Sequence, residues 1–100
     1  MEITIKATGI TLTPDLEKVI NDKVGGLSKF FDNIIRANVE VGRTTRHHQK
    51  GDVFLAEVNL EVPKKIIRAE SETQDIIVSL NDVKDKLKIE LIKYKELLRD

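Results

Sequence analysis

Apolar and polar residues alternate near the N-terminus, where Ile3, Ile5 and Ala7 lie between polar neighbours. This period of two is typical of a strand with one buried face, so we predict a first strand over residues 2–8. The same alternation predicts a second strand over residues 35–41 and a third over residues 54–62. After a tight connection at 63–65, residues 66–69 are expected to form a short fourth strand. The apolar positions of the second and third strands are Ile35, Ala37, Val39, Val41, Phe54, Ala56, Val58, Leu60 and Val62.

Two longer segments carry apolar residues at spacings of three and four, which predicts helices. The first helix is expected to begin at Pro14 with Thr13 as its cap, because proline needs no amide partner in the first turn. Gly25-Gly26 is expected to bend this helix or end it early. The second helix is predicted over residues 74–99. Their buried stripes are Leu16, Val19, Ile20, Val24, Leu27, Phe30 and Phe31, and then Ile76, Leu80, Val83, Leu87, Leu91, Tyr94 and Leu98.

The order of elements is strand, helix, three strands, helix. It predicts an α+β fold in which both helices cover one face of a four-stranded sheet. One hundred residues are enough for one core, so we expect a single domain over residues 1–100.

Charge and composition restrict the possible partners. Seventeen Lys and Arg balance seventeen Asp and Glu, so any affinity for nucleic acid must come from the placement of cations. With four aromatic residues, base stacking is a weak source of affinity. The chain has no cysteine, no apolar run of membrane-spanning length and no secretory pattern at its start. We therefore expect a soluble cytoplasmic protein, monomeric as this chain.

The connector between the second and third strands concentrates positive charge. No acid occurs in it before Asp52. A cationic loop at the tip of a hairpin is suited to gripping a phosphate backbone, although a solvated loop without a partner is the alternative. The candidate binding residues here are Arg43, Arg46, His47, His48 and Lys50.

The last helix carries cations on both sides of its apolar stripe. Lys84, Lys88, Lys95 and Arg99 share one flank that is nearly free of acids, whereas Lys86 and Lys93 lie on the opposite flank. The first flank is the better phosphate-binding ridge by geometry. Lysines beside an apolar stripe also serve simply to keep a helix soluble.

The sequence gives little support for catalysis or metal binding. His47 and His48 are adjacent, which rarely lets both bind one ion, and the chain has no other histidine. Its serines lack a nucleophile-elbow context and its glycines form no phosphate-cradling motif. We expect no enzymatic activity, metal, cofactor or small-molecule substrate. Glu57, Asn59 and Glu61 are expected to point out of the sheet as a solvated or partner-facing surface.

An ordered series of short motifs resembles the bacterial ribosome hibernation promoting factors, also called ribosome-associated translation inhibitors or sigma-54 modulation proteins. The series runs through His47 to Leu60, Val62-Pro63, Arg68-Ala69-Glu70, Asp75, Asp85-Lys86-Leu87 and Leu91 to Lys95. The resemblance implies a fold similar to a double-stranded RNA-binding domain. It also implies binding to the small ribosomal subunit where messenger and transfer RNA would lie.

The resemblance also implies particular RNA-binding positions, namely His48, Lys50, Arg68, Lys86, Lys93 and Lys95. The chain departs from the family pattern after Asp75, where Ile76-Ile77 and Asn81 replace a Met-Tyr pair and an acid. Long family members continue into a second domain, so we expect either a short-form factor or the N-terminal domain of a long one. Two alternatives stay open: a protein-binding regulatory module acting on a transcription factor, and a general double-stranded RNA binder.

Overall fold

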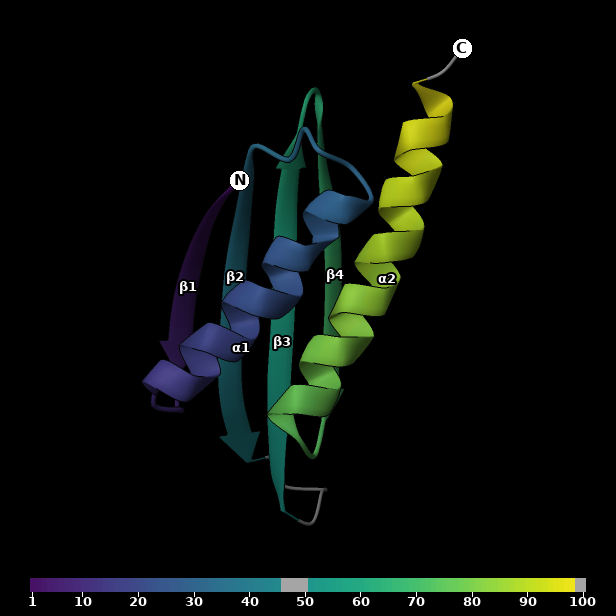
Figure 1. Cartoon of the computed structure of the whole chain (residues 1–100). Coiled ribbons are helices and arrows are strands. Elements are labelled where there is room, and N and C mark those ends of the chain that lie inside the picture. The colour runs from purple at the N-terminus through teal and green to yellow at the C-terminus, as the bar shows by residue number, and fades with distance from the viewer. Residues whose placement is uncertain (46–50, 99–100) are drawn as a thin grey trace.

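A computed structural model of the chain describes residues 1–45 and 51–98. The strands are β1 (Glu2–Thr8), β2 (Arg36–Thr45), β3 (Asp52–Val62) and β4 (Lys65–Thr73). They form one sheet in the order β1-β2-β3-β4 (Figure 1). β1 pairs with β2 in parallel, and the other neighbours pair antiparallel. The sheet is therefore mixed, with β1 and β4 at its edges.

The described residues also form two helices and a short 3-10 turn: α1 (Pro14–Gly25), η1 (Gly26–Lys29) and α2 (Ile76–Leu97). Figure 1 shows α1 and α2 side by side on the same face of the sheet. The predicted α+β fold, its order of elements and the placement of both helices are confirmed. The Thr13 hydroxyl accepts a hydrogen bond from the Leu16 amide, and Pro14 opens α1 as expected. The helix ends at Gly25, where the double glycine favours a change to the tighter 3-10 turn.

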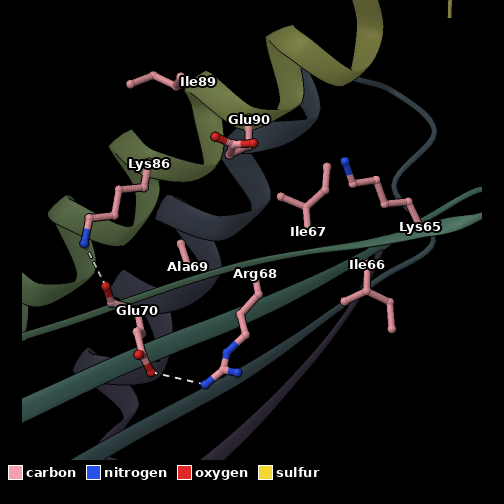
Figure 2. Close-up of a pocket in the computed structure, with 9 residues that line it drawn as sticks. All are labelled: Lys65, Ile66, Ile67, Arg68, Ala69, Glu70, Lys86, Ile89 and Glu90. Carbon is pink, nitrogen blue, oxygen red and sulfur yellow. Dashed lines mark hydrogen bonds and ion pairs between the residues drawn. The ribbon is translucent and has the colours of Figure 1, made fainter. Parts of the chain in front are cut away.

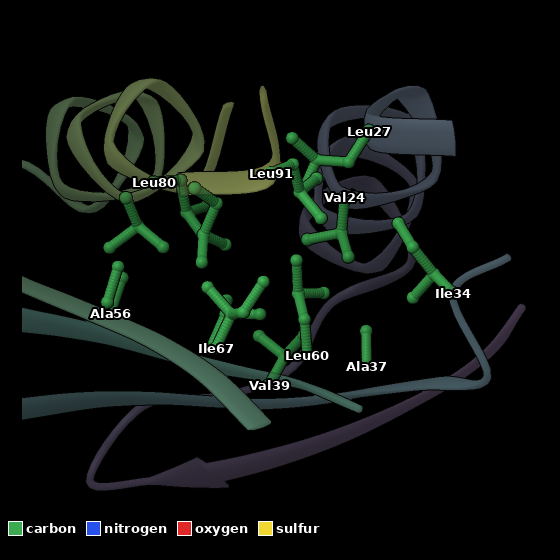
Figure 3. Close-up of a cluster of buried hydrophobic side chains, with 14 of the residues drawn as sticks. Val24, Leu27, Ile34, Ala37, Val39, Ala56, Leu60, Ile67, Leu80 and Leu91 are labelled. Atoms are coloured by element: carbon green, nitrogen blue, oxygen red, sulfur yellow. The ribbon is translucent and has the colours of Figure 1, made fainter. Parts of the chain in front are cut away.

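The core lies between the helices and the sheet. Figure 3 shows Ala37, Val39 and Leu60 pointing from the strands toward Val24, Leu27, Leu80 and Leu91 of the helix layer. Alternation in the strands and the three-to-four spacing in the helices thus direct apolar side chains into one shared volume. Ser79 is also buried there, and its hydroxyl donates a 2.8 Å hydrogen bond to the Phe54 carbonyl oxygen.

Several predicted boundaries are wrong. β4 spans nine residues instead of four, because Ser71 and Thr73 continue the inward alternation that Ile67 and Ala69 begin. Small hydroxyl side chains interrupted the apolar signal in the sequence. α2 begins at Ile76 instead of residue 74, because the Asp75 carboxylate accepts the Ile77 amide and acts as the cap. β2 runs from Arg36 to Thr45 instead of over residues 35–41, and β3 begins at Asp52 instead of residue 54, so this hairpin extends further than the apolar alternation indicated.

Two residues placed in buried stripes are exposed. Ile35 is 48% exposed, and its neighbour Ile34 occupies the core instead, because Ile35 precedes the first residue of β2 and is outside the pleated alternation. Leu98 is 57% exposed and follows the last residue of α2. It lines an open pocket of about 430 Å³ with Phe31, Pro63 and Tyr94, so the buried stripe of α2 ends at Tyr94.

Replacing two leucines of α2 by alanine, one at a time, tests which face of the helix is buried. Leu87 is fully buried, so Leu87→Ala should lower the free energy of unfolding by about 2–5 kcal/mol through reduced burial and a cavity. Leu97 is 69% exposed, and Leu97→Ala should change it by no more than about 0.5 kcal/mol. Urea unfolding followed by circular dichroism measures both. Equal losses in the two variants would contradict the assignment of the buried face.

Candidate nucleic-acid interface

One flank of α2 faces α1 and η1. Lys88 places its ammonium 5.0 Å from the centre of the Phe30 ring, a cation–π contact. The Lys23 ammonium of α1 donates a hydrogen bond to the Asn81 side-chain oxygen of α2. Because Lys84 and Lys95 lie on the same side of α2 as Asn81 and Lys88, the flank predicted to be a basic ridge borders the space between the two helices.

The first helix and η1 add cations that the sequence analysis missed. Lys29 and Lys95 line an open pocket of about 270 Å³ with Phe30, Ile92 and one acid, Glu96. Only the packing of the two helices brings these residues together, since Lys29 and Lys95 are far apart in the chain. We call the resulting set the inter-helix lysines: Lys23, Lys29, Lys84, Lys88 and Lys95.

The opposite flank of α2 lies against the edge strand β4. The Lys86 ammonium donates a 2.8 Å hydrogen bond to the Glu70 carbonyl oxygen, and the Lys93 ammonium lies 3.7 Å from a Glu90 carboxylate oxygen. Both lysines remain exposed at the surface. The structure thus separates the two flanks of α2 that the sequence left as competing candidates, one toward α1 and one toward β4.

Arg68 lies on neither flank but on the sheet face that no helix covers. Its guanidinium contacts the carboxylates of Glu57 at 2.8 Å and Glu70 at 3.2 Å. The hydrogen bond to Glu57 and the charges of Glu57 and Glu70 raise the pKa of Arg68 above its ordinary value, so Arg68 stays positively charged. Arg68 thus lies on the opposite face of the sheet from the inter-helix lysines, although it lines the same open groove at the β4 edge as Lys86.

Carboxylates outnumber cations on this uncovered sheet face within the described residues. Arg36 lies 3.7 Å from Glu2 and 3.6 Å from Glu61, so each arginine of the face is shared between two carboxylates. The pairing register and the side-chain alternation place these charged residues on the face: Glu2, Glu40, Glu57, Glu61, Glu70 and Glu72, with Lys6, Arg36 and Arg68.

The structure describes the two ends of the basic connector, residues 43–45 and 51–52. Arg43 is exposed near the end of β2 and pairs in register with Phe54. Gly9, in the turn after β1, has a φ of +69° and lies so close to Arg43 that a Cβ there would be 2.7 Å from the Arg43 carbonyl oxygen. The remaining predicted positions, Arg46, His47, His48, Lys50 and Arg99, lie outside the described residues.

Polar contacts lie at both ends of α2, and the one at its C-terminal end joins the helix to the sheet. Asp75 caps the first turn, and the Tyr94 hydroxyl donates to the Pro63 carbonyl oxygen in the β3–β4 turn. The Tyr94 ring also packs edge-on against Phe31, with ring centres 5.3 Å apart. The helix is thereby held against the sheet near its start by the Ser79 hydroxyl, which donates to the Phe54 carbonyl oxygen, and near its end by Tyr94.

Two further features bear on function. Across residues 1–45 and 51–98, histidine, aspartate and glutamate form no group of three that could hold a metal ion. None of the described helices is long and apolar enough to cross a bilayer.

Comparison with known families identifies the chain's relatives. A family model described as "Sigma 54 modulation protein / S30EA ribosomal protein" matches residues 3–99. The chain belongs to this family. The resemblance stated from the motifs is therefore confirmed, and the match extends over nearly the whole chain.

Curated relatives are similar at low identity. A ribosome hibernation promoting factor of Klebsiella oxytoca is 28% identical over 101 residues, covering 99% of this chain and 98% of that protein. The ribosome hibernation promotion factor of Lactococcus lactis is 26% identical over 95 residues, covering 95% of this chain and 50% of that protein. The chain thus spans nearly all of one relative and half of the other.

Solved structures share the fold. The N-terminal domain of Thermus thermophilus Protein Y superimposes with a TM-score of 0.79 at 19% identity, covering 94% of this chain and 99% of that one. A ribosomal subunit interface protein of Coxiella burnetii gives a TM-score of 0.81 at 21% identity, covering 96% and 99%. The arrangement of four strands and two helices described above is thus shared by both proteins.

The cap at Asp75 provides a test of how the first turn of α2 is stabilised. Asp75→Ala removes the acceptor of the Ile77 amide and should lower the free energy of unfolding by about 1 kcal/mol. Asp75→Asn keeps an acceptor oxygen and should retain most of the stability. Thermal or urea unfolding measures the difference, and equal losses for the two variants would show that the carboxylate charge, and not the cap, stabilises the helix.

Proposed function

We propose that this chain is a ribosome hibernation factor that binds the small ribosomal subunit in the channel used by messenger and transfer RNA. It blocks translation there by steric exclusion, without catalysis, and acts in the cytoplasm. The observation that carries this proposal is the family membership over residues 3–99, together with the curated names of its relatives.

The distribution of charge supports contact with RNA on the helix side. The inter-helix lysines lie along the space between α1 and α2, whereas carboxylates outnumber cations on the described part of the uncovered sheet face. A phosphate backbone would be attracted to the first surface and repelled by the second. A formally neutral chain can therefore bind RNA in one orientation.

The chemistry of these side chains favours recognition of RNA shape over base sequence. Lysine ammonium groups contact phosphates as point charges, and they carry little sequence information. Phe30, the aromatic ring beside the inter-helix lysines, is already covered by the Lys88 ammonium. We therefore expect binding to depend on the placement of phosphates in folded ribosomal RNA.

Charge reversal on the two flanks of α2 tests which flank faces RNA. Lys88→Glu combined with Lys95→Glu should weaken binding to purified small subunits by about tenfold or more, because two attractive phosphate interactions become repulsive. The matched control is Lys86→Glu combined with Lys93→Glu, which changes the net charge equally on the flank that lies against β4. We expect a loss below about threefold for the control.

Filter binding or sedimentation with small subunits measures both double variants. If the control pair weakens binding more than the first pair does, the flank against β4 is the RNA-facing one. If neither pair weakens binding, α2 is not part of the interface.

Charge reversal in the connector tests the hairpin contribution. Arg46→Glu combined with Lys50→Glu should weaken sedimentation with ribosomes, and the effect should be largest at low salt. The slope of log affinity against log salt should become shallower by about two, one for each phosphate that the variant no longer neutralises. If the double variant pellets as well as wild type across the salt series, the connector does not bind phosphate.

A second candidate function is protein-binding regulation of a transcription factor. The family description names sigma 54 modulation, and the uncovered sheet face carries an excess of carboxylates that suits a basic protein. Ribonuclease treatment of material captured from cells distinguishes the two. Loss of the bound material supports ribosome binding, and its persistence supports a protein partner.

A further inference from the structure

The edge strand β4 presents backbone groups that point away from the sheet. A two-residue turn joins Val62 to Lys65, and in such hairpins the residues that flank the turn exchange both backbone hydrogen bonds. Hydrogen-bonded and non-bonded pairs then alternate along the strands. The residues of β4 at positions 66, 68 and 70 therefore direct their N–H and C=O groups to the open edge.

The hydrogen bond made by Lys86 supports this assignment independently. Its ammonium donates a 2.8 Å hydrogen bond to the carbonyl oxygen of Glu70, as an outward-directed carbonyl allows. Lys86 thus occupies one acceptor at one end of the edge. β4 is the last strand of the sheet, so no strand within the described residues pairs with the outward groups of Ile66 and Arg68.

A groove accompanies this part of the edge. It has a volume of about 510 Å³ and lies between residues 65–70 of β4 and one turn of α2, lined on the helix side by Lys86, Ile89 and Glu90 (Figure 2). Figure 2 shows Ile67 on the helix side of the strand, with Ile66 and Arg68 on the other side. Ile66 is 65% exposed and Ile89 is 55% exposed, so apolar side chains border the edge on both sides.

We infer that the β4 edge is a docking site for an extended segment of a partner protein, which adds a fifth strand beside Ile66 and Arg68. Four backbone hydrogen bonds would be available, from the N–H and C=O groups of these two residues. This inference is independent of the proposed function, because it uses a surface on the other side of α2 from the inter-helix lysines.

The surroundings of the groove define the chemistry of the segment. A side chain opposite Ile67 would point toward Ile89 and should be apolar. Side chains on the other face would lie over the uncovered sheet, where Arg68 is already bound by Glu57 and Glu70 and carboxylates are in excess. The segment should therefore alternate apolar residues with lysine or arginine.

A second copy of this chain fits the edge poorly. Pairing two β4 strands would set them about 4.8 Å apart, whereas packed helices need about 8–10 Å between their axes. Each copy carries α2 beside its own β4. Two hydrogen bonds hold it there, from the Ser71 hydroxyl to the Asp82 carboxylate and from the Lys86 ammonium to the Glu70 carbonyl oxygen. Two such helices would compete for the same space, while a single strand without a covering helix would not.

The test uses a short, end-blocked peptide that alternates lysine and valine, added to the isotopically labelled chain. Nuclear magnetic resonance should show slower exchange of the Ile66 and Arg68 amide protons and contacts between the peptide backbone and β4. Two control peptides separate the contributions: one with the same residues in two blocks, and one that alternates glutamate and valine. Both should bind at least about tenfold more weakly.

Proline substitution isolates the backbone contribution. Arg68→Pro removes an outward N–H that the β3–β4 pairing does not use, so the fold should survive while peptide affinity falls about tenfold. Arg68→Ala keeps the N–H and frees the Glu57 and Glu70 carboxylates, so it should bind the lysine-valine peptide at least as tightly as wild type does. Circular dichroism verifies folding, and Ile66→Pro with Ile66→Ala repeats the comparison if Arg68→Pro fails to fold.

Several results would overturn the inference. Equal binding of the peptide to Arg68→Pro and Arg68→Ala would exclude strand addition. Spectral changes confined to the inter-helix lysines would exclude the proposed site. Equal binding of the glutamate and lysine peptides would exclude the proposed charge preference. A concentration-dependent dimer that protects the same amides would identify a second copy as the occupant.

Discussion

The burial of one sheet face beneath both helices is the constraint on which the other surfaces depend. Val39 and Leu60 point from the strands into the space that Leu87 and Leu91 fill from α2. Once the apolar stripe of α2 faces the sheet, the helix has no freedom to rotate, because turning it would expose buried leucines to water. Its two charged flanks are therefore fixed in direction, one toward α1 and the other toward the edge of β4.

This packing also turns a neutral composition into an uneven surface. The helices protect only one side of the sheet, so the polar positions of the strands gather on the other side and bring their carboxylates together. Arg36 and Arg68 keep that face from becoming strongly repulsive, because each contacts two carboxylates. Such exposed ion pairs add little to stability. Their consequence is that few cations on this described face are available to a phosphate backbone.

The fold could be predicted from the sequence because each element carries its own periodic signal. The helix cap at Thr13, the break at Gly25 and the alternation in three strands are local features, and the structure confirms them. The predicted extent of β4 was wrong, since Ser71 and Thr73 face inward without being apolar. Ile35 and Leu98 were misplaced because periodicity does not reveal where an element ends.

The candidate site was less predictable for a different reason. A helical wheel grouped Lys84, Lys88 and Lys95 correctly, since they share one helix. Lys23 and Lys29 join them only through the packing of α1 against α2, which the sequence does not specify. The family motif supplied Arg68, whose place on the uncovered sheet face follows from the strand register.

Lys86 illustrates how the two flanks of α2 divide their roles. By resemblance it is an RNA-binding position, yet its ammonium already donates to the carbonyl of Glu70 at the open edge of the sheet. Unpaired edges invite unwanted strand pairing, and a lysine at the edge is a common defence against it. Lys86 protects one end of the β4 edge and leaves Ile66 and Arg68 accessible. Binding of RNA by Lys86 would require this hydrogen bond to break, whereas the lysines that face α1 can bind phosphate without disturbing the edge.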